Sequence, residues 1–418
     1  MGRARVHARR VRPPARRARR SGRASVSDRP SLLVVVQRYG DVAGGAEAHA
    51  RALVNHLAPH AAIEVATTTA RDYWTWENAY TAGLTWVDGV PVRRFPVDRG
   101  RARDFRLREH RAFAAGHSLA DELAFVDAQG PVAPDLRDHL LAHGRDFDHV
   151  LFFTYIYWPT LTGLPLVPER AVLVPTAHDE PAIGLGVYRP VFHAPRAIAY
   201  NTEEERRMVH RRFNNERVPG EIVGVGVDAL AGEAMRFRQR HALAGPLFLY
   251  VGRIVESKGC RELFERWARW QDGSPQKATL VLIGHREMTI PERPDIVHLG
   301  TVAEQEKWDA LAACTALLVP SVLESLSLVT LEAWAASRPI VCDASSPVVA
   351  SMARRAGAGL AHRDAAEFAA ICELLMERRE IGQGLGRAGA AFVARTYTWP
   401  SVVEKYLDLF AEVRARNA

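Results

Sequence analysis

From Ser31 onward, short apolar runs alternate with longer segments whose apolar positions recur every three or four residues. The short runs predict buried strands, and the amphipathic segments predict helices that cover them. In the first half of the chain the predicted strands are Leu32–Val36, Ile63–Thr67, Val90–Phe95, His149–Thr154, Ala171–Pro175 and Ala197–Asn201, and the predicted helices are Ala46–Leu57, Phe105–Ala128 and Thr202–Phe213. This alternation predicts a parallel sheet with helices on both faces.

A second series of the same kind follows. Its predicted strands are Leu247–Val251, Thr279–Ile283, Ile296–His298, Ala316–Pro320, Ile340–Cys342 and Gly359–Ala361, and its predicted helices are Lys258–Trp270, Ala303–Ala313, Leu326–Ala336 and Ala365–Met376. We therefore expect an α/β protein with two Rossmann-like domains facing across a cleft, residues 31–222 and 223–397, and a C-terminal helix in 398–418 that returns to the first domain. Ligands of open α/β sheets bind beyond the carboxyl ends of the strands, which makes the cleft the expected site.

The composition, 48% hydrophobic and 25% charged in 418 residues, is that of an ordinary globular protein. The net charge of +7 is concentrated in residues 1–30, which hold 11 Arg and one acid, so residues 31–418 carry a net charge of −3. Residues 1–30 are predicted to be a disordered tail. A basic arm for anionic lipid or RNA and a merely unstructured extension both remain open, but the folded part does not suit nucleic acid.

The four cysteines, Cys260, Cys314, Cys342 and Cys372, are widely spaced and suggest neither zinc ligation nor disulfides. No apolar stretch approaches the roughly 18 residues of a membrane span, and the Arg-rich start lacks the apolar core of a signal peptide. We therefore expect a cytoplasmic protein.

The segment from Pro320 to Glu332 places two glutamates around a helix start. A strand ends at Pro320, Glu324 lies in the loop, and Ser325 or Ser327 is suited to cap the following helix. The amides of that first turn favour an anion such as a diphosphate. Glu332 is expected roughly 7–9 Å further along the helix, within reach of a ribose. Alternatively, both glutamates are simply solvated charges.

Two cations follow the first strand of the second domain. Gly252 and Arg253 come directly after Leu247–Val251, and Lys258 opens the next helix. Arginine offers a planar fork and lysine a point charge, both suited to a diphosphate. The alternative is a surface cluster in which they pair with Glu256.

The first domain offers weaker candidates. Gly44 and Gly45 precede a helix, where glycine allows the backbone to approach a phosphate or sugar closely. His178 follows the strand Ala171–Pro175, at the mouth of the sheet, and its neighbour Asp179 is expected to orient the ring. The aromatic residues within 72–78 either stack on an acceptor sugar or pack against their own domain.

Several of these segments resemble the family 4 retaining glycosyltransferases, the glycosyl transferases group 1, which have the GT-B fold. The matching segments are Pro320–Val341 for the Glu-x7-Glu signature, Tyr250–Gly259 for the Gly-Arg…Lys-Gly motif, Gly44–Glu47 for the Gly-Gly loop, and Leu280–Gly284 and Leu299–Val302 for the strands between. They occur in the family's order over about 300 residues.

The resemblance implies transfer of a sugar from a nucleotide diphosphate sugar to an acceptor hydroxyl, with retention at the anomeric carbon and no separate cofactor. It implies that Glu324 holds the donor sugar and that Glu332 holds the ribose. It also implies that Arg253, Lys258 and the helix start near Ser325, Leu326, Ser327 and Leu328 bind the diphosphate. The Gly44–Gly45 loop would close over the donor, and His178 would lie near the transferred sugar. Bacterial relatives build envelope and capsular glycans and glycolipids. The resemblance therefore implies a glycan, lipid-linked or small-molecule acceptor and a peripheral contact with the inner membrane surface.

The chain departs from the family pattern around the signature. Glu-Ser-Leu-Ser stands where many members have Glu-Gly-Phe-Gly, and Ser337-Arg338-Pro339 replaces the usual Gly-x-Pro. Serine at a position that tolerates only glycine is expected to be strained. The added side chains are expected to reshape the sugar pocket and so to affect the choice of donor.

Other functions are less well supported by the sequence. Asp146-Phe147-Asp148 matches a metal-binding Asp-x-Asp but precedes a strand, so we expect no metal. Gly224-Val225-Gly226 lacks the third glycine and distant acid of a dinucleotide-binding motif, which makes an NAD-dependent oxidoreductase a weak alternative. A sugar- or nucleotide-binding protein that kept the fold without the activity is the other alternative.

Overall fold

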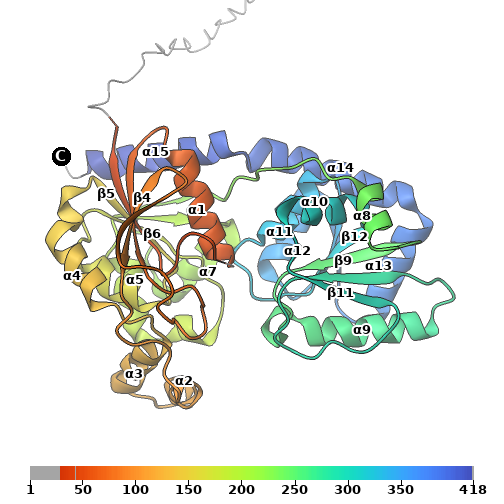
Figure 1. Ribbon diagram of the computed structural model, residues 1–418, viewed down its shortest axis with the longest axis horizontal. Coiled ribbons are helices and arrows are strands. Elements are labelled where there is room, and N and C mark those ends of the chain that lie inside the picture. The colour runs from red at the N-terminus through yellow and green to blue at the C-terminus, as the bar shows by residue number, and fades with distance from the viewer. Residues whose placement is uncertain (1–28, 43, 417–418) are drawn as a thin grey trace, which may run out of the picture.

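The computed structural model describes residues 29–42 and 44–416 of the chain. It consists of two α/β domains that lie side by side, each built on one sheet (Figure 1). The two predicted Rossmann-like domains are thus confirmed. The predicted disordered tail falls almost entirely on residues 1–28 and lies outside the described residues.

The sheet of the N-terminal domain has eight strands in the order β3-β4-β2-β1-β5-β6-β7-β8. The strands are β1 Ser31–Val35, β2 Ala62–Thr68, β3 Gly83–Val87, β4 Val90–Phe95, β5 His149–Phe153, β6 Ala171–Val174, β7 Ala197–Tyr200 and β8 Gly220–Ile222. All neighbours are parallel except the β3–β4 hairpin at the edge. Leu32 and Val34 of β1 pack into one apolar cluster and Leu33 and Val35 into another. Both faces of the central strands are therefore buried, as their unbroken apolar runs predict.

The helices of this domain are α1 Gly45–Leu57, α2 Phe105–Phe113, α3 Leu119–Gln129, α4 Pro134–His143, α5 Trp158–Gly163, α6 Arg189–His193 and α7 Glu203–Phe213. The single helix predicted over Phe105–Ala128 is wrong. Gly116 adopts a φ of 79° between α2 and α3, and Ser118 starts α3 with a capping box in which Asp121 is the partner. The sequence pattern also missed α4 and the strands β3 and β8.

The sheet of the C-terminal domain has six parallel strands in the order β11-β10-β9-β12-β13-β14. They are β9 Leu247–Val251, β10 Thr279–Ile283, β11 Ile296–Gly300, β12 Ala316–Val319, β13 Ile340–Asp343 and β14 Gly359–His362. The helices are α8 Ala234–Arg240, α9 Cys260–Gly273, α10 Glu304–Ala313, α11 Leu328–Ala335, α12 Pro347–Ala356, α13 Ala365–Glu377 and α14 Arg379–Thr396.

The last helix, α15 Trp399–Ala415, leaves the C-terminal domain and packs against α1, β7 and β8 (Figure 1). The chain therefore passes between the domains twice, after β8 and again after α14. The two passages touch, because the amide of Val227 donates to the carbonyl of Tyr397 at 3.1 Å. Gly226 also lies so close to the indole of Trp399 that a Cβ would come within 2.4 Å of it.

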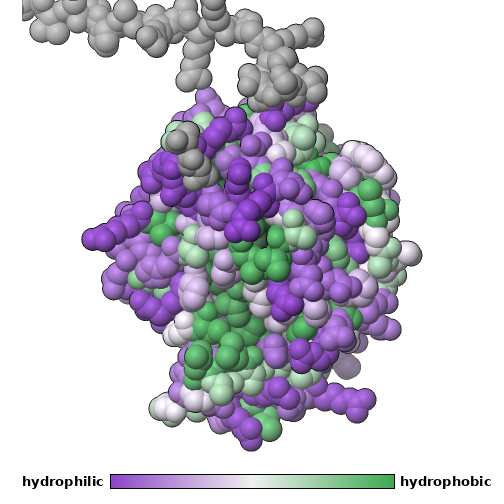
Figure 2. All heavy atoms as spheres, turned by 90° about the vertical axis from the view of Figure 1, so that its left-hand side faces the viewer, coloured by the Kyte–Doolittle hydropathy of each residue, from purple (hydrophilic) through white to green (hydrophobic). Residues whose placement is uncertain are grey.

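The outer face of the N-terminal domain carries apolar side chains in its lower part, surrounded by hydrophilic ones (Figure 2). Leu107 of α2, Leu119 and Leu123 of α3 and Leu141 of α4 are exposed large hydrophobic residues. Within the described residues, no helix combines the length and apolarity needed to span a membrane.

Candidate active site

The site predicted from the sequence lies where the two domains meet. In the N-terminal domain, the hydroxyl of Thr202, which follows β7, donates to the carbonyl of Ser325 at 3.0 Å. A second contact joins Glu204 of α7 to Arg355 of α12 in an ion pair. The loop that carries Glu324 is thus in direct contact with the N-terminal domain.

Glu324 and Lys258 form one ion pair of this site. Lys258 Nζ lies 2.8 Å from Glu324 Oε1, and both side chains are partly exposed, at 31% and 17%. Lys258 ends the one-turn helix η6 (Glu256–Lys258), so the predicted helix start at Lys258 is corrected to Cys260. Gly259, at a φ of 72°, lets this turn approach β12, because a Cβ there would come within 2.5 Å of the carbonyl of Pro320. The two residues assigned to sugar and diphosphate are therefore neighbours.

Glu332 on α11 forms the second pair, with a lysine that the sequence analysis missed. Lys307 Nζ on α10 lies 2.7 Å from Glu332 Oε1 and 2.8 Å from Glu304 Oε1. Burial raises the pKa of Glu332, while Lys307 opposes that rise. Burial alone would lower the pKa of Lys307, but the two carboxylates raise it above its ordinary value. The chain has only four lysines, and this scarcity is the one signal that could have identified Lys307.

Arg253 lies in a third group, beside Gly252. Gly252 adopts a φ of 153°, and Gly284 packs so closely on it that a Cβ at Gly284 would overlap the Gly252 carbonyl. Arg253 Nη1 lies 3.5 Å from Glu287 Oε1. The alternative pairing with Glu256 is wrong, because Glu256 pairs with Arg261 instead.

The start of α11 contains Ser325, Leu326, Ser327 and Leu328. Ser327 holds the N-cap position, but neither it nor Ser325 caps the helix through its hydroxyl, which corrects the prediction. The Ser327 hydroxyl lies instead 2.9 Å from that of Thr330. Ser327 has a φ of 72° and Ser337 a φ of 57°, the left-handed region that favours glycine. The expected strain therefore falls on two of the serines that replace glycine in the family pattern.

The Gly-Gly loop rests on a buried ion pair. Arg38 Nη2 lies 2.6 Å from Glu47 Oε1, and both side chains are almost fully buried. Gly44 has a φ of 155°, and a Cβ there would come within 2.1 Å of Glu47 Oε2. Gly45 begins α1 and has open space around it. Glycine at position 44 is therefore favoured by its backbone conformation, and a larger residue would have to displace the Glu47 carboxylate.

His178 lies in the loop after β6, at the carboxyl edge of the sheet. The expected partner was wrong, because Asp179 pairs with Arg212 and Glu180 Oε1 lies 3.6 Å from His178 Nδ1. Glu205 of α7 holds this loop in place, because its carboxylate accepts a hydrogen bond from the Ala177 amide at 2.5 Å. The sequence analysis did not identify Glu205.

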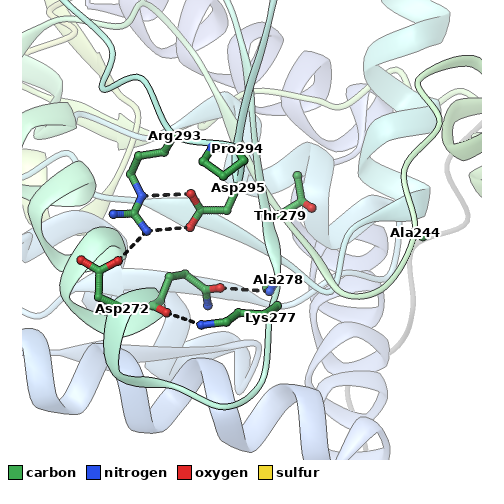
Figure 3. A pocket seen from close by; sticks show the side chains of 9 residues that line it. Ala244, Asp272, Lys277, Ala278, Thr279, Arg293, Pro294 and Asp295 are labelled. Atoms are coloured by element: carbon green, nitrogen blue, oxygen red, sulfur yellow. Dashed lines mark hydrogen bonds and ion pairs between the residues drawn. The ribbon is translucent and has the colours of Figure 1, made fainter.

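One pocket of the C-terminal domain lies away from these residues. It is lined by Ala244, before β9, by Lys277 to Thr279 at the start of β10 and by Arg293 to Asp295 before β11 (Figure 3). These residues stand at the amino ends of the strands, opposite the predicted site. Arg293 is held by Asp295 and Asp272, so we assign the pocket no catalytic role.

The described residues contain no group of three or more His, Cys, Asp or Glu side chains placed to hold a metal ion. Asp148, from the Asp-x-Asp segment, accepts hydrogen bonds from the amide and hydroxyl of Ser31.

Comparison with known proteins confirms the family resemblance for the C-terminal domain. Residues 245–378 match the family described as glycosyl transferases group 1. A putative teichuronic acid biosynthesis glycosyltransferase, TuaC of Bacillus subtilis, is 31% identical over 151 residues, which are 35% of this chain and 37% of TuaC. A D-inositol 3-phosphate glycosyltransferase of Jonesia denitrificans is 23% identical over 59% of this chain and 64% of its own length. The chain thus spans less than two thirds of either relative.

Solved structures match the whole fold. A sucrose-phosphate synthase from Thermosynechococcus elongatus has a TM-score of 0.69 at 16% identity, over 93% of this chain and 100% of that chain. Anabaena HepE, in complex with UDP-glucose, has a TM-score of 0.66 at 13% identity, over 92% of this chain and 100% of that chain. The predicted fold class, two Rossmann-like domains in the GT-B arrangement, is confirmed.

Proposed function

We propose that this protein is a glycosyltransferase that moves a sugar from a nucleotide diphosphate sugar to an acceptor hydroxyl, with retention of the anomeric configuration. The observation that carries the proposal is the pairing of Lys258 with Glu324 and of Lys307 with Glu332 within the segment that matches the glycosyl transferases group 1. Each pair offers a carboxylate for sugar hydroxyls beside a cation for phosphate. UDP-glucose, bound by the structurally similar HepE, is the type of donor we expect.

The proposed roles follow from position. Glu324 binds hydroxyls of the donor sugar, and Glu332 accepts hydrogen bonds from the ribose. Lys258 and Arg253, which are partly exposed, stabilise the negative charge that develops on the departing diphosphate. Cations held in place before the reaction commonly make the largest single contribution to catalysis. Donor and acceptor are the only small molecules required, and no cofactor takes part.

Retention is proposed to come from attack on the same face of the sugar that the diphosphate leaves. The acceptor oxygen forms its bond to the anomeric carbon as the bond to the diphosphate breaks, and a phosphate oxygen takes the acceptor proton. The N-terminal candidate, His178, is proposed to orient sugar hydroxyls and to transfer no proton.

The acceptor is proposed to be an envelope glycan or glycolipid. Support comes from the relative named for teichuronic acid biosynthesis. The exposed leucines of α2 and α3, together with the exposed Arg103 and Arg111, suit peripheral contact with an anionic inner membrane surface. Flotation with vesicles that contain phosphatidylglycerol tests this contact, which high salt should weaken.

A nucleotide screen tests the donor site. Purified protein is heated with UDP-, GDP- and ADP-sugars, and the matching donor should add about 2.7 kcal/mol of stability at 100 times its dissociation constant. Absence of a shift with every nucleotide would overturn the proposal.

Activity separates an enzyme from an inactive binding protein of the same fold. With the identified donor, the parent protein should release nucleoside diphosphate, by transfer or by slow hydrolysis. Glu324→Gln should lose turnover while it binds the bare diphosphate at least as tightly as the parent, because Glu324 is proposed to contact only the sugar of the donor and its charge competes for Lys258. Binding without turnover in the parent would favour the inactive alternative.

A further inference from the structure

We propose that Tyr73, in the N-terminal domain, is a positioning residue for Arg253, and that Glu287 holds Arg253 until a diphosphate replaces it. The inference rests on the proposed function, because it assumes that Arg253 binds the diphosphate. It adds a residue of the opposite domain to the donor site.

Two contacts between the domains and one ion pair within the C-terminal domain carry the proposal. The Tyr73 hydroxyl donates to Glu287 Oε2 at 2.9 Å. The guanidinium carbon of Arg253 lies 4.6 Å from the centre of the Tyr73 ring, a cation–π distance. Arg253 Nη1 lies 3.5 Å from Glu287 Oε1. One tyrosine thus contacts both members of an ion pair that belongs to the other domain.

The loop that presents Tyr73 is held firmly in its own domain. The Asp72 carboxylate accepts hydrogen bonds from the amides of Trp74 at 3.0 Å and Thr75 at 2.7 Å. Arg101 donates to the carbonyl of Trp74 at 2.9 Å. These bonds hold the backbone beside Tyr73 in place without the help of Arg253.

Glu287 is fixed just as firmly on the other side of the cleft. Its amide donates to the carbonyl of Ile254 at 2.9 Å, and the Ile254 amide donates to the carbonyl of His285 at 2.9 Å. The loops after β9 and β10 are therefore joined, with Arg253 next to the joint. Arg253, whose side chain is 41% exposed, is the member of the three that can turn toward a ligand.

The arrangement predicts opposite effects for the two partners of Arg253. The Tyr73 ring limits the orientations of the guanidinium, so its loss should weaken diphosphate binding. Glu287 competes for Arg253 and repels a diphosphate, so removal of its charge should strengthen binding. A purely structural role would weaken binding in both variants.

Calorimetric titration with UDP tests this on the full-length protein. Tyr73→Ala should raise the dissociation constant about 5- to 30-fold, as expected for loss of one cation–π contact. Tyr73→Phe, which keeps the ring, should stay within about threefold of the parent, and Glu287→Gln should bind more tightly. In an Arg253→Ala background, Tyr73→Ala should have no further effect. Equal losses from Tyr73→Ala with and without Arg253 would overturn the proposal.

A measurement without ligand keeps the test independent of the donor. Hydrogen exchange at residues 252–258 and 284–287 should speed up in Tyr73→Ala and stay unchanged in Trp86→Ala, an exposed aromatic at the sheet edge. If UDP, GDP and ADP all fail to bind the parent, the proposed function fails. Hydrogen exchange then tests by itself whether Tyr73 contacts Arg253 and Glu287. Unchanged hydrogen exchange in Tyr73→Ala would overturn the proposed contact.

Discussion

Each domain places a glutamate on the helix that follows a strand at the cleft, but the two glutamates have different partners. Glu205 on α7 is 1% exposed. Its carboxylate accepts hydrogen bonds from the backbone amides of Ala177 at 2.5 Å and Asn201 at 2.6 Å. Glu332 on α11 has a side chain that is 20% exposed and is paired with Lys307. A carboxylate that accepts hydrogen bonds from backbone amides holds loops together. A carboxylate that forms an ion pair with a flexible lysine can exchange that lysine for a ligand. Stability should therefore depend on Glu205, and ligand affinity on Glu332.

The largest expected effect is on stability at Glu205. Glu205→Ala leaves the two amides buried and unpaired, each at a cost of about 1–3 kcal/mol, so the free energy of unfolding should fall by about 2–6 kcal/mol. Urea denaturation at neutral pH measures the loss. Glu332→Ala serves as the control and should lose clearly less. A similar loss in both variants would remove the distinction between the two residues.

The pH dependence of stability follows from the same residue. Burial raises the pKa of Glu205 from 4.5 to about 8, against the opposing effect of the backbone amides. Between these values the native state binds the proton more strongly than the unfolded state does. Stability should therefore fall as pH rises from about 4.5 to about 8, by at most about 1.4 kcal/mol per pH unit, and level off above. Urea midpoints measured across this range should become flatter in Glu205→Gln, and an unchanged slope in that variant would contradict the assignment.

A smaller effect, on binding, is expected at Glu332. Glu332→Gln loses charged hydrogen bonds to the ribose worth about 1.5–3 kcal/mol, so the dissociation constant of UDP should rise roughly 10- to 150-fold. Calorimetric titration measures this. Glu304→Gln removes the exposed partner of Lys307 and should stay within about twofold of the parent. Unchanged affinity in Glu332→Gln would show that α11 does not hold the nucleotide.

The smallest effect is expected at the ends of α11. Ser337 has a φ of 57°, so Ser337→Gly should relieve backbone strain and raise stability by about 0.5–1 kcal/mol. Ser327→Gly relieves similar strain but loses the contact with the Thr330 hydroxyl, so its net effect should be close to zero. Thermal denaturation compares the two. A loss of stability in Ser337→Gly would mean that the serine side chain makes a compensating contact.

Much of the fold could be predicted because buried parallel strands are continuous apolar runs. The strands Leu247–Val251 and Thr279–Ile283 are such runs and coincide with their predicted bounds. The edge strands β3 and β8 were missed, since their residues are largely exposed and carry no such run. The apolar pattern therefore misses short edge strands whose residues are largely exposed.

The candidate site could be predicted only as far as its residue types. Sequence motifs named Glu324, Glu332, Arg253 and Lys258 as candidates, and these assignments stay predictions. The partner of Glu332 depends on how α10 packs beside α11, which residue spacing does not determine. The expectation that Asp179 orients His178 was wrong for a related reason. Neighbouring side chains in a loop point in different directions, and only the folded backbone decides which one faces the ring.

The two passages of the chain between the domains limit how the cleft can move. Because Val227 and Tyr397 are hydrogen-bonded and Gly226 lies against Trp399, the passages form one two-stranded connection. Rotation of the domains about an axis along this connection leaves the contacts between the two passages intact. Twisting one domain relative to the other would instead pull the two passages apart. We therefore expect the domains to move mainly by changing a single opening angle. Small-angle scattering with and without nucleotide can follow this angle as a change in the radius of gyration.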